Sequence, residues 1–323
     1  MPAIATFEEL LGRTREADAV PVAVVAAENE SALRAVAAAS AAGFARPVLI
    51  GAPDTVRAVI DEAGLRDLRD ARLVPARSPE AAAETAVELA RSGEAAVLLK
   101  GSLRTDQLLK AVLHRDRGLR TGRFLSDVLL YQDTLAGRAR LVGVTDGGIN
   151  PEPDQEALKQ IVANAVDTMR ALGWDRPRVA LLSATEAVTD AVASTGRARA
   201  VAEWAARHLE GADVAGPLAL DNALLESAAR AKGIEGPVAG RADVLVTPSI
   251  EAGNILGKGV KYLGGSITAH VVVGARVPIL IPSRVESAED KLHSIALGVL
   301  VAASGRPGGR PGTERAADRG PRR

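Results

Sequence analysis

The segment 278–303 carries the residues whose types and spacing are best suited to chemistry. An apolar run ends just before Ser283, which with Arg284 opens a predicted helix that runs to the end of the segment. At about 100° per residue, Ser283, Ser287 and Asp290 share one face of that helix. Backbone N–H groups at a helix N-terminus, a hydroxyl and a guanidinium together favour an anion such as phosphate. The segment therefore predicts an anion site at Ser283 and Arg284, with Asp290 close enough to act as a base on a second substrate.

A purely structural interpretation explains part of the same pattern. Ser283 and Glu286 have the S-x-x-E spacing of a capping box, in which each side chain satisfies a backbone N–H of the other residue. A polar stripe is also typical of a helix on the protein surface. The residues alone leave both interpretations open.

Four further segments place glycine, proline and polar side chains where a binding cleft needs them. They are 100–106, 145–151, 216–222 and 251–258. In open parallel sheets, ligands bind beyond the carboxyl ends of the strands, where such loops lie. Each segment by itself also has the composition of a turn followed by a helix cap.

The elements that position these loops alternate along the chain. Short β-branched runs predict strands at 21–27, 47–51, 95–99, 128–130, 141–145, 179–183, 244–247, 270–273 and 277–281. Longer Ala-rich stretches predict helices at 30–42, 54–63, 105–113, 154–172, 199–208, 224–232 and 285–303. Strands that are apolar on both faces and separated by helices indicate an α/β fold with a largely parallel sheet covered on both sides.

The length of 323 residues favours two domains. A short polar turn at 137–140 suggests the boundary, and the last helix is expected to return to the first block. The predicted domains are therefore 1–139 plus 283–303, and 140–282. The segment 304–323 contains six Arg and no periodic pattern, which predicts a disordered basic tail.

Composition excludes several classes of function. Hydrophobic residues make up 47% of the chain and aromatic residues 2%, so a sizeable core of Ala, Val, Leu and Ile is expected. Forty basic side chains balance forty acidic ones, which argues against a general nucleic-acid or membrane-surface binder. The absence of Cys excludes disulfides, thiolate metal sites and a cysteine nucleophile. With no signal-peptide pattern and no run of about 20 apolar residues, we expect a cytoplasmic protein.

Several catalytic fingerprints are missing. The chain has no G-x-G-x-x-G after its first strand, no G-x-x-x-x-G-K-[ST], no H-E-x-x-H and no G-x-S-x-G. These absences argue against the usual dinucleotide, nucleoside-triphosphate, zinc-protease and serine-hydrolase sites, and we expect no metal. His270 lies in an apolar strand and is interpreted as a core residue rather than a general base.

Six ordered motifs together resemble the phosphate acetyltransferase/phosphate butyryltransferase family over nearly all of 21–303. The matching stretches are LLKGSLRTDQLLKAVL (98–113), GLRTGRFLSDV (118–128), TDGGINPEPD (145–154), GPLALDNA (216–223), GPVAGRADVLVTPSIEAGNILGK (236–258) and GARVPILIPSR (274–284). The GLRTG and EAGN versions resemble the butyryltransferase-like branch.

The resemblance implies reversible transfer of an acetyl or butyryl group between coenzyme A and phosphate. It also implies a two-domain, three-layer αβα fold like that of the isocitrate and isopropylmalate dehydrogenases, with the site in the interdomain cleft. Acyl-CoA or coenzyme A, phosphate and acyl phosphate would be its substrates, without a separate cofactor. A homodimer or higher homo-oligomer is expected, with no nucleic-acid or membrane partner.

The resemblance also implies roles for individual residues. Ser283 and Arg284 would contact phosphate, and Asp290 would take the thiol proton; Glu289 is the alternative base, because butyryltransferase-like members often lack the Asp. Lys110 falls near an additional phosphate-binding arginine of the acetyltransferases. The expected substrate-binding set is Lys100, Lys110, Asp146, Asn150, Asp221, Asn222, Asn254, Lys258 and Ser287.

Two departures from the family pattern leave other functions open. Ala215 and Ser249 stand where an Asp is common. They would fit a non-catalytic sensor of acyl phosphate or coenzyme A. A dehydrogenase of the same fold is a further alternative, although no nicotinamide-binding pattern supports it.

Overall fold

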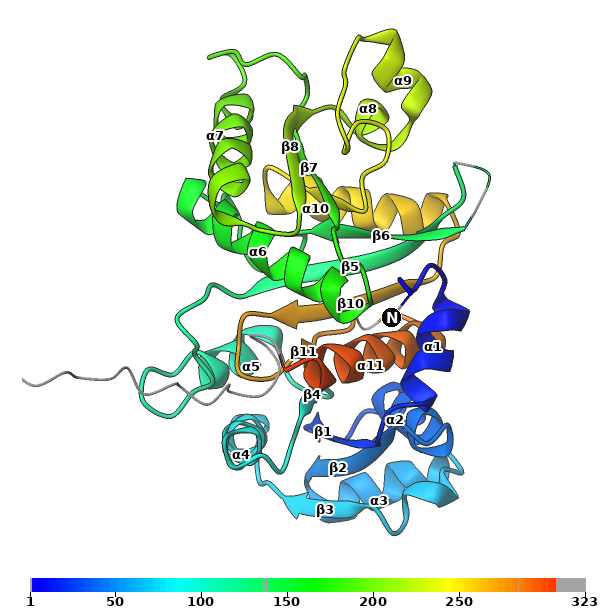
Figure 1. Cartoon of the computed structure of the whole chain (residues 1–323). Helices are drawn as coiled ribbons and strands as arrows, with labels where there is room; N and C mark the ends of the chain where they lie inside the picture. The colour runs from blue at the N-terminus through cyan, green and yellow to red at the C-terminus, as the bar shows by residue number, and fades with distance from the viewer. Residues whose placement is uncertain (1, 136, 138, 284, 306–323) are drawn as a thin grey trace, which may run out of the picture.

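One eleven-stranded sheet runs through the part of the chain that the structure describes (Figure 1). The computed structural model describes residues 2–135, 137, 139–283 and 285–305. The strand order is β3-β2-β1-β4-β11-β10-β5-β6-β9-β7-β8, which in Figure 1 runs from β3 at the bottom to β8 at the top. The strands are β1 (Val20–Val25), β2 (Ala45–Gly51), β3 (Arg72–Pro75), β4 (Val97–Lys100), β5 (Ser126–Asp133), β6 (Arg140–Thr145), β7 (Arg178–Leu182), β8 (Asp213–Leu218), β9 (Val244–Val246), β10 (Thr268–Val273) and β11 (Ile279–Leu280).

Helices connect most of these strands. They are α1 (Phe7–Arg15), α2 (Glu30–Ala41), α3 (Pro53–Glu62), α4 (Pro79–Ser92), α5 (Thr105–Val112), α6 (Gln155–Ala171), α7 (Ala193–His208), α8 (Leu220–Leu224), α9 (Glu226–Ala231), α10 (Ile250–Lys258) and α11 (Ala288–Ala303), with the short helices η1 (Arg66–Leu68) and η2 (Gly259–Leu263). Several begin at a side chain that accepts a hydrogen bond from the first-turn backbone: Thr6, Asn29, Ser78, Asp154, Ser249 and Ser287.

Two parallel blocks meet in an antiparallel centre. Strands β3, β2, β1, β4 and β11 pair in parallel, as do β6, β9, β7 and β8. Between them, β10 is antiparallel to both β11 and β5, and β5 is antiparallel to β6. The α/β class and the largely parallel sheet are confirmed. The short links between β5 and β6 and between β10 and β11 are what make the centre antiparallel.

The two faces of the sheet are covered differently. Helices α1, α2, α3, α6, α7 and α11 share one continuous core with the strands on one face. On the other face, α4 and α5 cover one end of the sheet, and α8 and α10 cover the other. These two smaller cores leave a gap over the central strands, and the candidate site lies there.

The last predicted helix begins later than expected. Instead of opening at Ser283, α11 begins at Ala288 with Ser287 as its N-cap, so the expected face shared by Ser283, Ser287 and Asp290 is wrong. Val285, which lies before the helix, is 73% exposed. The sequence pattern also missed α1, β3, α4, β8 and α10.

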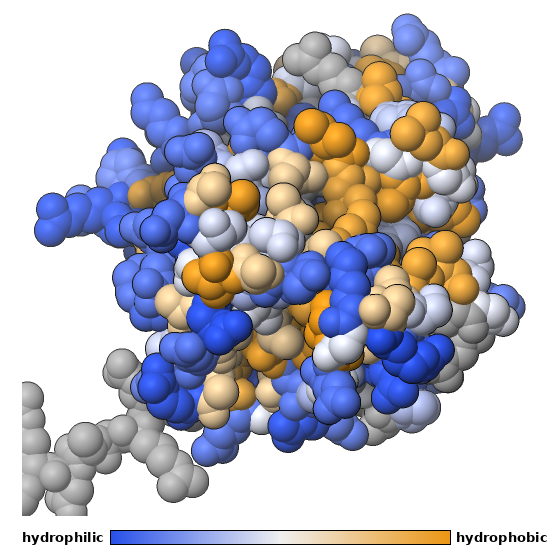
Figure 2. Space-filling model, turned by 90° about the horizontal axis from the view of Figure 1, so that it is seen from above, coloured by the Kyte–Doolittle hydropathy of each residue, from blue (hydrophilic) through white to orange (hydrophobic). Residues whose placement is uncertain are grey.

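The predicted domain boundaries stay a prediction. Helix α11 packs against α1, α2 and β4 from the segment 1–139, and also against β10 and α6 from the segment 140–282. The predicted basic tail lies outside the described residues from position 306 onward. In the described part of the chain, no helix has the length and apolarity needed to cross a bilayer. The surface seen from above in Figure 2 is mostly hydrophilic, with one continuous apolar area.

A buried ion pair joins β7 to the residue before β9. Asp243 is 3% exposed and accepts hydrogen bonds from the Arg178 backbone N (2.9 Å), Nε (2.9 Å) and Nη2 (2.7 Å). Replacing Asp243 by Ala leaves a partly buried guanidinium unpaired, so we expect a loss of about 3 kcal/mol in the free energy of unfolding. Denaturant titration of the full chain measures it.

The matched control for this prediction is Asp213→Ala. Its partner Arg176 has a 63% exposed side chain, so the loss should stay below about 1 kcal/mol. An equal loss of unfolding free energy in the two variants would contradict the prediction that the buried ion pair contributes more than the exposed one.

Candidate active site

A cavity of about 510 Å³ opens over the central strands, in the gap between α5 and α10. Its walls come from the ends of β4, β6 and β11, from one face of β5 and β10, and from α10 and η2. A second cavity of about 420 Å³ adjoins it and shares Lys100, Arg104 and Ser283. Cavities of this size accommodate small-molecule substrates.

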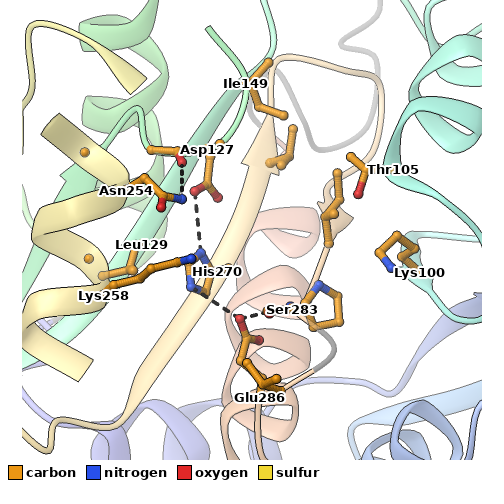
Figure 3. Close-up of a pocket in the computed structure, with 18 of the residues that line it drawn as sticks. Lys100, Thr105, Asp127, Leu129, Ile149, Asn254, Lys258, His270, Ser283 and Glu286 are labelled. Carbon is orange, nitrogen blue, oxygen red and sulfur yellow. Dashed lines mark hydrogen bonds and ion pairs between the residues drawn. The ribbon is translucent and has the colours of Figure 1, made fainter. Parts of the chain in front are cut away.

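A line of acidic and imidazole groups crosses the floor of the larger cavity (Figure 3). The Asp127 Oδ2 lies 3.5 Å from the His270 Nδ1, and the His270 Nε2 lies 3.8 Å from the Glu286 Oε1. Glu286 Oε1 in turn accepts a hydrogen bond from the Ser283 backbone N at 3.0 Å. The four residues come from β5, β10 and the segment after β11, so their meeting depends on the tertiary fold.

The two-residue period of the strands turns these side chains toward the cavity. His270 pairs with Leu129, and Val272 with Asp127, across the antiparallel β10–β5 ladder. All four line the cavity, whereas the alternate residues of both strands belong to the core beneath the opposite face. His270 and Asp127 are therefore diagonal neighbours on one face of the sheet.

Burial and charge oppose each other at His270. Burial of the ring works to lower the pKa of His270, but the carboxylates of Asp127 and Glu286 outweigh it, and the pKa is raised. The imidazole is thus held ready to carry a proton near neutral pH.

Cationic and amide side chains occupy the walls. Lys100, at the end of β4, points its Nζ to the Leu103 carbonyl (3.3 Å) and lines both cavities. Lys258 and Lys261 come from α10 and η2. The Asn254 Nδ2 donates to the Gly147 carbonyl at 3.2 Å. These walls suit a ligand that carries several negative charges.

The carboxylate of Asp146 holds the loop after β6 through hydrogen bonds. Its Oδ1 accepts the backbone N–H groups of Gly148 and Ile149, and its Oδ2 accepts the side-chain Nδ2 of Asn150. Burial and the neighbouring Asp127 raise the pKa of Asp146 to about 6. Asp146 and Asn150 thus shape a loop whose Gly147 and Gly148 line the cavity.

Close packing of α10 on this loop requires glycine. A Cβ added at Gly253 would lie 2.5 Å from the Asp146 carbonyl oxygen and 2.8 Å from the Gly147 Cα. These contacts are too short for any side chain, so Gly253 allows α10 to bring Asn254 and Lys258 to the cavity.

Asp290 is committed to structural contacts. Its carboxylate pairs with Lys261 Nζ (2.7 Å), accepts from Ser287 Oγ (2.5 Å), and accepts from the Thr268 backbone N (3.1 Å). Burial works to raise the pKa of Asp290, but the hydrogen bonds from Lys261, Ser287 and Thr268 outweigh it and lower the pKa to about 2. Asp290 is not among the cavity-lining residues, and this geometry does not favour it as a base.

The predicted site residues divide into three groups. The cavity wall includes Lys100, Asn254, Lys258 and Ser283. Asp146 and Asn150 lie in the supporting loop. The other predicted site residues that the structure describes do not line this cavity: Lys110, Asp221, Asn222, Ser287 and Asp290. Arg284 lies outside the described residues.

Sequence reasoning missed Asp127, Lys261, His270 and Glu286 as cavity residues. His270 was interpreted as a core residue, yet its side chain is 23% exposed toward the cavity. The signal in the sequence is one polar residue inside an apolar run, because His270 lies between Ala269 and Val271 in β10. Asp127 follows Ser126 at the polar start of β5 and gives no such signal.

The structural role of Asp290 leads to a stability prediction. Asp290→Asn removes the ion pair with Lys261 and one half of the capping box. Because the pKa of Asp290 lies below that of an unfolded Asp, its stabilisation is present above about pH 4 and is lost as the pH falls to about 2. We expect a loss of about 2 kcal/mol in unfolding free energy at pH 7 that vanishes by pH 2.

Thermal or denaturant unfolding across this pH range measures the effect. Glu289→Gln, at an exposed position of the same helix turn, should cost less than about 1 kcal/mol. An Asp290→Asn protein as stable as the parent at pH 7 would contradict the structural role.

Comparison with known proteins identifies related chains and related folds. The family model described as phosphate acetyl/butaryl transferase matches residues 76–299. A phosphate butyryltransferase of Clostridium beijerinckii is 37% identical over 298 residues, covering 92% of this chain and 98% of its own. A phosphate acetyltransferase of Rhizobium meliloti is 41% identical over 299 residues, covering 92% and 93%.

Solved structures show the same architecture. A branched-chain phosphotransacylase from Enterococcus faecalis V583 has a TM-score of 0.74 at 29% identity, covering 87% of this chain and 98% of its own. A phosphotransacetylase from Streptococcus pyogenes (TM-score 0.77, 21% identity, 93% and 99% coverage) supports the fold alone. So does a 4-hydroxythreonine-4-phosphate dehydrogenase from Burkholderia phymatum, with a TM-score of 0.55, 18% identity, and 88% and 99% coverage. The protein therefore belongs to the phosphate acetyl/butyryl transferase family.

Proposed function

We propose that this protein is a phosphate acyltransferase that moves a short acyl group reversibly between coenzyme A and phosphate. One cavity carries the proposal, because it contains two kinds of groups. Lys100 and Ser283 are suited to binding phosphate, and the neighbouring His270 and Glu286 are suited to proton transfer. Membership of the family supports the same reaction. Coenzyme A is here a substrate, and no separate cofactor is proposed.

The phosphate group fits best where the two cavities meet. Lys100, Arg104 and Ser283 line both of them, and the smaller cavity also contains Lys291 but no carboxylate among its described lining residues. Two lysines and an arginine around a hydroxyl form an environment for a multiply charged anion. Arg284, for which the resemblance implies contact with phosphate, follows Ser283 in the sequence and lies outside the described residues.

Coenzyme A would enter from the side of α10. Lys258 is exposed at the cavity wall and is suited to the phosphates of coenzyme A, whereas the thiol must reach the floor. Asn254 and the glycine loop after β6 line the same cavity and offer polar contacts to the connecting amide chain. The apolar Leu129, Val144 and Val272 leave room for a short acyl chain.

The chemistry balances without a covalent enzyme intermediate. The thiol sulfur loses its proton and forms a bond to the acyl carbon, the acyl carbon–oxygen bond breaks, and the departing phosphate takes up a proton. The chain has no Cys, so a thioester to the protein is excluded. Cationic side chains stabilise the charge that develops on the departing phosphate.

The substitutions at Ala215 and Ser249 are compatible with activity. Ser249 still caps α10 by accepting from the Ala252 backbone N at 3.4 Å, as an Asp there would do. Ala215 lies in β8 and does not line the larger cavity. The homo-oligomer and the cytoplasmic location stay predictions.

Phosphate-dependent release of free coenzyme A tests the function. Acetyl-, propionyl- and butyryl-CoA are incubated with and without phosphate, and the released thiol is read with a thiol reagent, to which the Cys-free protein adds no background. We expect release only with phosphate, and the rates for the three substrates rank the acyl chains. Folded protein that binds these ligands without release would indicate the non-catalytic sensor instead.

Variants of the residues that are predicted to bind phosphate test where phosphate lies in the cavity. Arg284→Ala and Lys100→Met should each raise the KM for phosphate at least about tenfold, because each removes one charged contact. Glu203→Gln, on the exposed surface of α7, is the matched control. Unchanged phosphate kinetics in both variants would contradict the phosphate position.

A further inference from the structure

The larger cavity has an apolar end next to α10. Leu129 of β5, Val144 of β6 and Gly257 of α10 line the cavity there. Leu129 pairs with Val144 across the β5–β6 ladder and with His270 across the β5–β10 ladder, so these three side chains form one row across three neighbouring strands. The row is therefore apolar on the side of β6 and polar on the side of β10.

Ser283 lies on the other side of His270. Strand β11, which the chain leaves just before Ser283, is the neighbour of β10 on the side away from β5. Figure 3 shows Leu129, His270 and Ser283 in this order across the cavity. An acyl phosphate with its phosphate at Ser283 and its carbonyl over His270 therefore directs its carbon chain toward Leu129 and Val144.

Buried side chains close the cavity behind this apolar end. The next member of the row is Leu245, which pairs with Val144 across the β6–β9 ladder and is 0% exposed. One pair further along β5 and β6, Tyr131 lies opposite Val142, and both are buried. These three residues belong to the same apolar core as Leu129 and Val144, but they do not line the cavity. A carbon chain that reaches Leu129 is therefore shielded from water and cannot extend much further.

Gly257 keeps space open between α10 and the apolar end of the row. A Cβ added at Gly257 would lie 2.9 Å from the Leu129 Cδ1, and it would meet no other described atom within 4 Å outside its own helix. Because this Cδ1 is the free end of a side chain, it can move while the backbone stays in place. A methyl group at Gly257 would therefore narrow the apolar end without disrupting the fold.

We infer that Leu129, Val144 and Gly257 form the pocket for the acyl chain and select a butyryl group over an acetyl group, an inference that rests on the proposed function. Neighbouring strands lie about 4.8 Å apart, so Leu129 is one strand spacing from a carbonyl that lies over His270. The carbon chain of a butyryl group extends across this spacing and ends against Leu129, whereas the methyl group of acetyl stops short of it. Burial of the additional methylene groups against apolar side chains favours the longer substrate.

The test compares kcat/KM for acetyl, butyryl and hexanoyl phosphate, with coenzyme A as the acceptor, in the wild-type protein and in two variants of the pocket. Gly257→Ala narrows the pocket, so the ratio of butyryl to acetyl should fall about tenfold. Leu129→Ala lengthens the pocket, so the ratio of hexanoyl to butyryl should rise about tenfold. The KM for coenzyme A should change less than about twofold in both variants, because neither substitution removes a polar or charged group.

A matched control lies close to each substituted position. Gly259→Ala adds the same methyl group two residues further along the chain, where the added Cβ would meet nothing within 4 Å. Leu130→Ala makes the same truncation in β5, but Leu130 is 0% exposed and belongs to the core on the opposite face of the sheet. Both controls should keep the wild-type ratios among the three acyl phosphates, because neither changes the pocket.

Two results would overturn the inference while the proposed function stands. One is a wild-type protein that uses acetyl phosphate as well as butyryl phosphate or better. The other is an unchanged ratio in a folded Gly257→Ala or Leu129→Ala protein, or an equal change of that ratio in its control; one folded variant is sufficient for this comparison. A folded wild-type protein that turns over none of the acyl phosphates would overturn the proposed function together with the inference.

Discussion

The site depends on the antiparallel register of β10. This strand joins two parallel blocks of opposite direction, with β11 on one side and β5 on the other. Its register places His270 opposite Leu129 and diagonal to Asp127 on the cavity face. A slip by one residue would turn His270 into the core and an apolar neighbour into the cavity. The pairing that closes the sheet is thus also what assembles the acidic and imidazole groups.

The segment between β11 and α11 performs two tasks at neighbouring positions. Ser283 and Glu286 belong to the cavity, whereas Ser287 and Asp290 begin the helix and connect it to Lys261 of η2. The buried Lys291 supports the segment by binding the Glu286 carbonyl. Asp290 anchors the helix to Lys261, and Glu286 is attached to Ser283, so both ends of the segment are held over the sheet.

Local patterns predicted most strands of the sheet but missed β3 and β8, the strands at its two edges. The ranges expected for β1, α2, β2 and α3 agree with the structure within about two residues, since apolar runs and helical periodicity are local properties. The segment before α11 contains two consecutive capping patterns, Ser283 with Glu286 and Ser287 with Asp290. The second begins the helix because Thr268 and Lys261, more than twenty residues away, bind Asp290. The sequence motifs located Lys100, Asn254 and Lys258 at the cavity, but the partners of His270 come from a distant strand and a later loop, which no spacing reveals.

We expect the acyl group to pass directly from one substrate to the other in a complex that holds both substrates in one cavity. Initial rates of thioester formation, with acyl phosphate and coenzyme A varied against each other, test it most directly. We expect double-reciprocal lines that intersect, as for a reaction through a ternary complex. Parallel lines, together with acyl-enzyme isolated in the absence of coenzyme A, would contradict direct attack by the thiol.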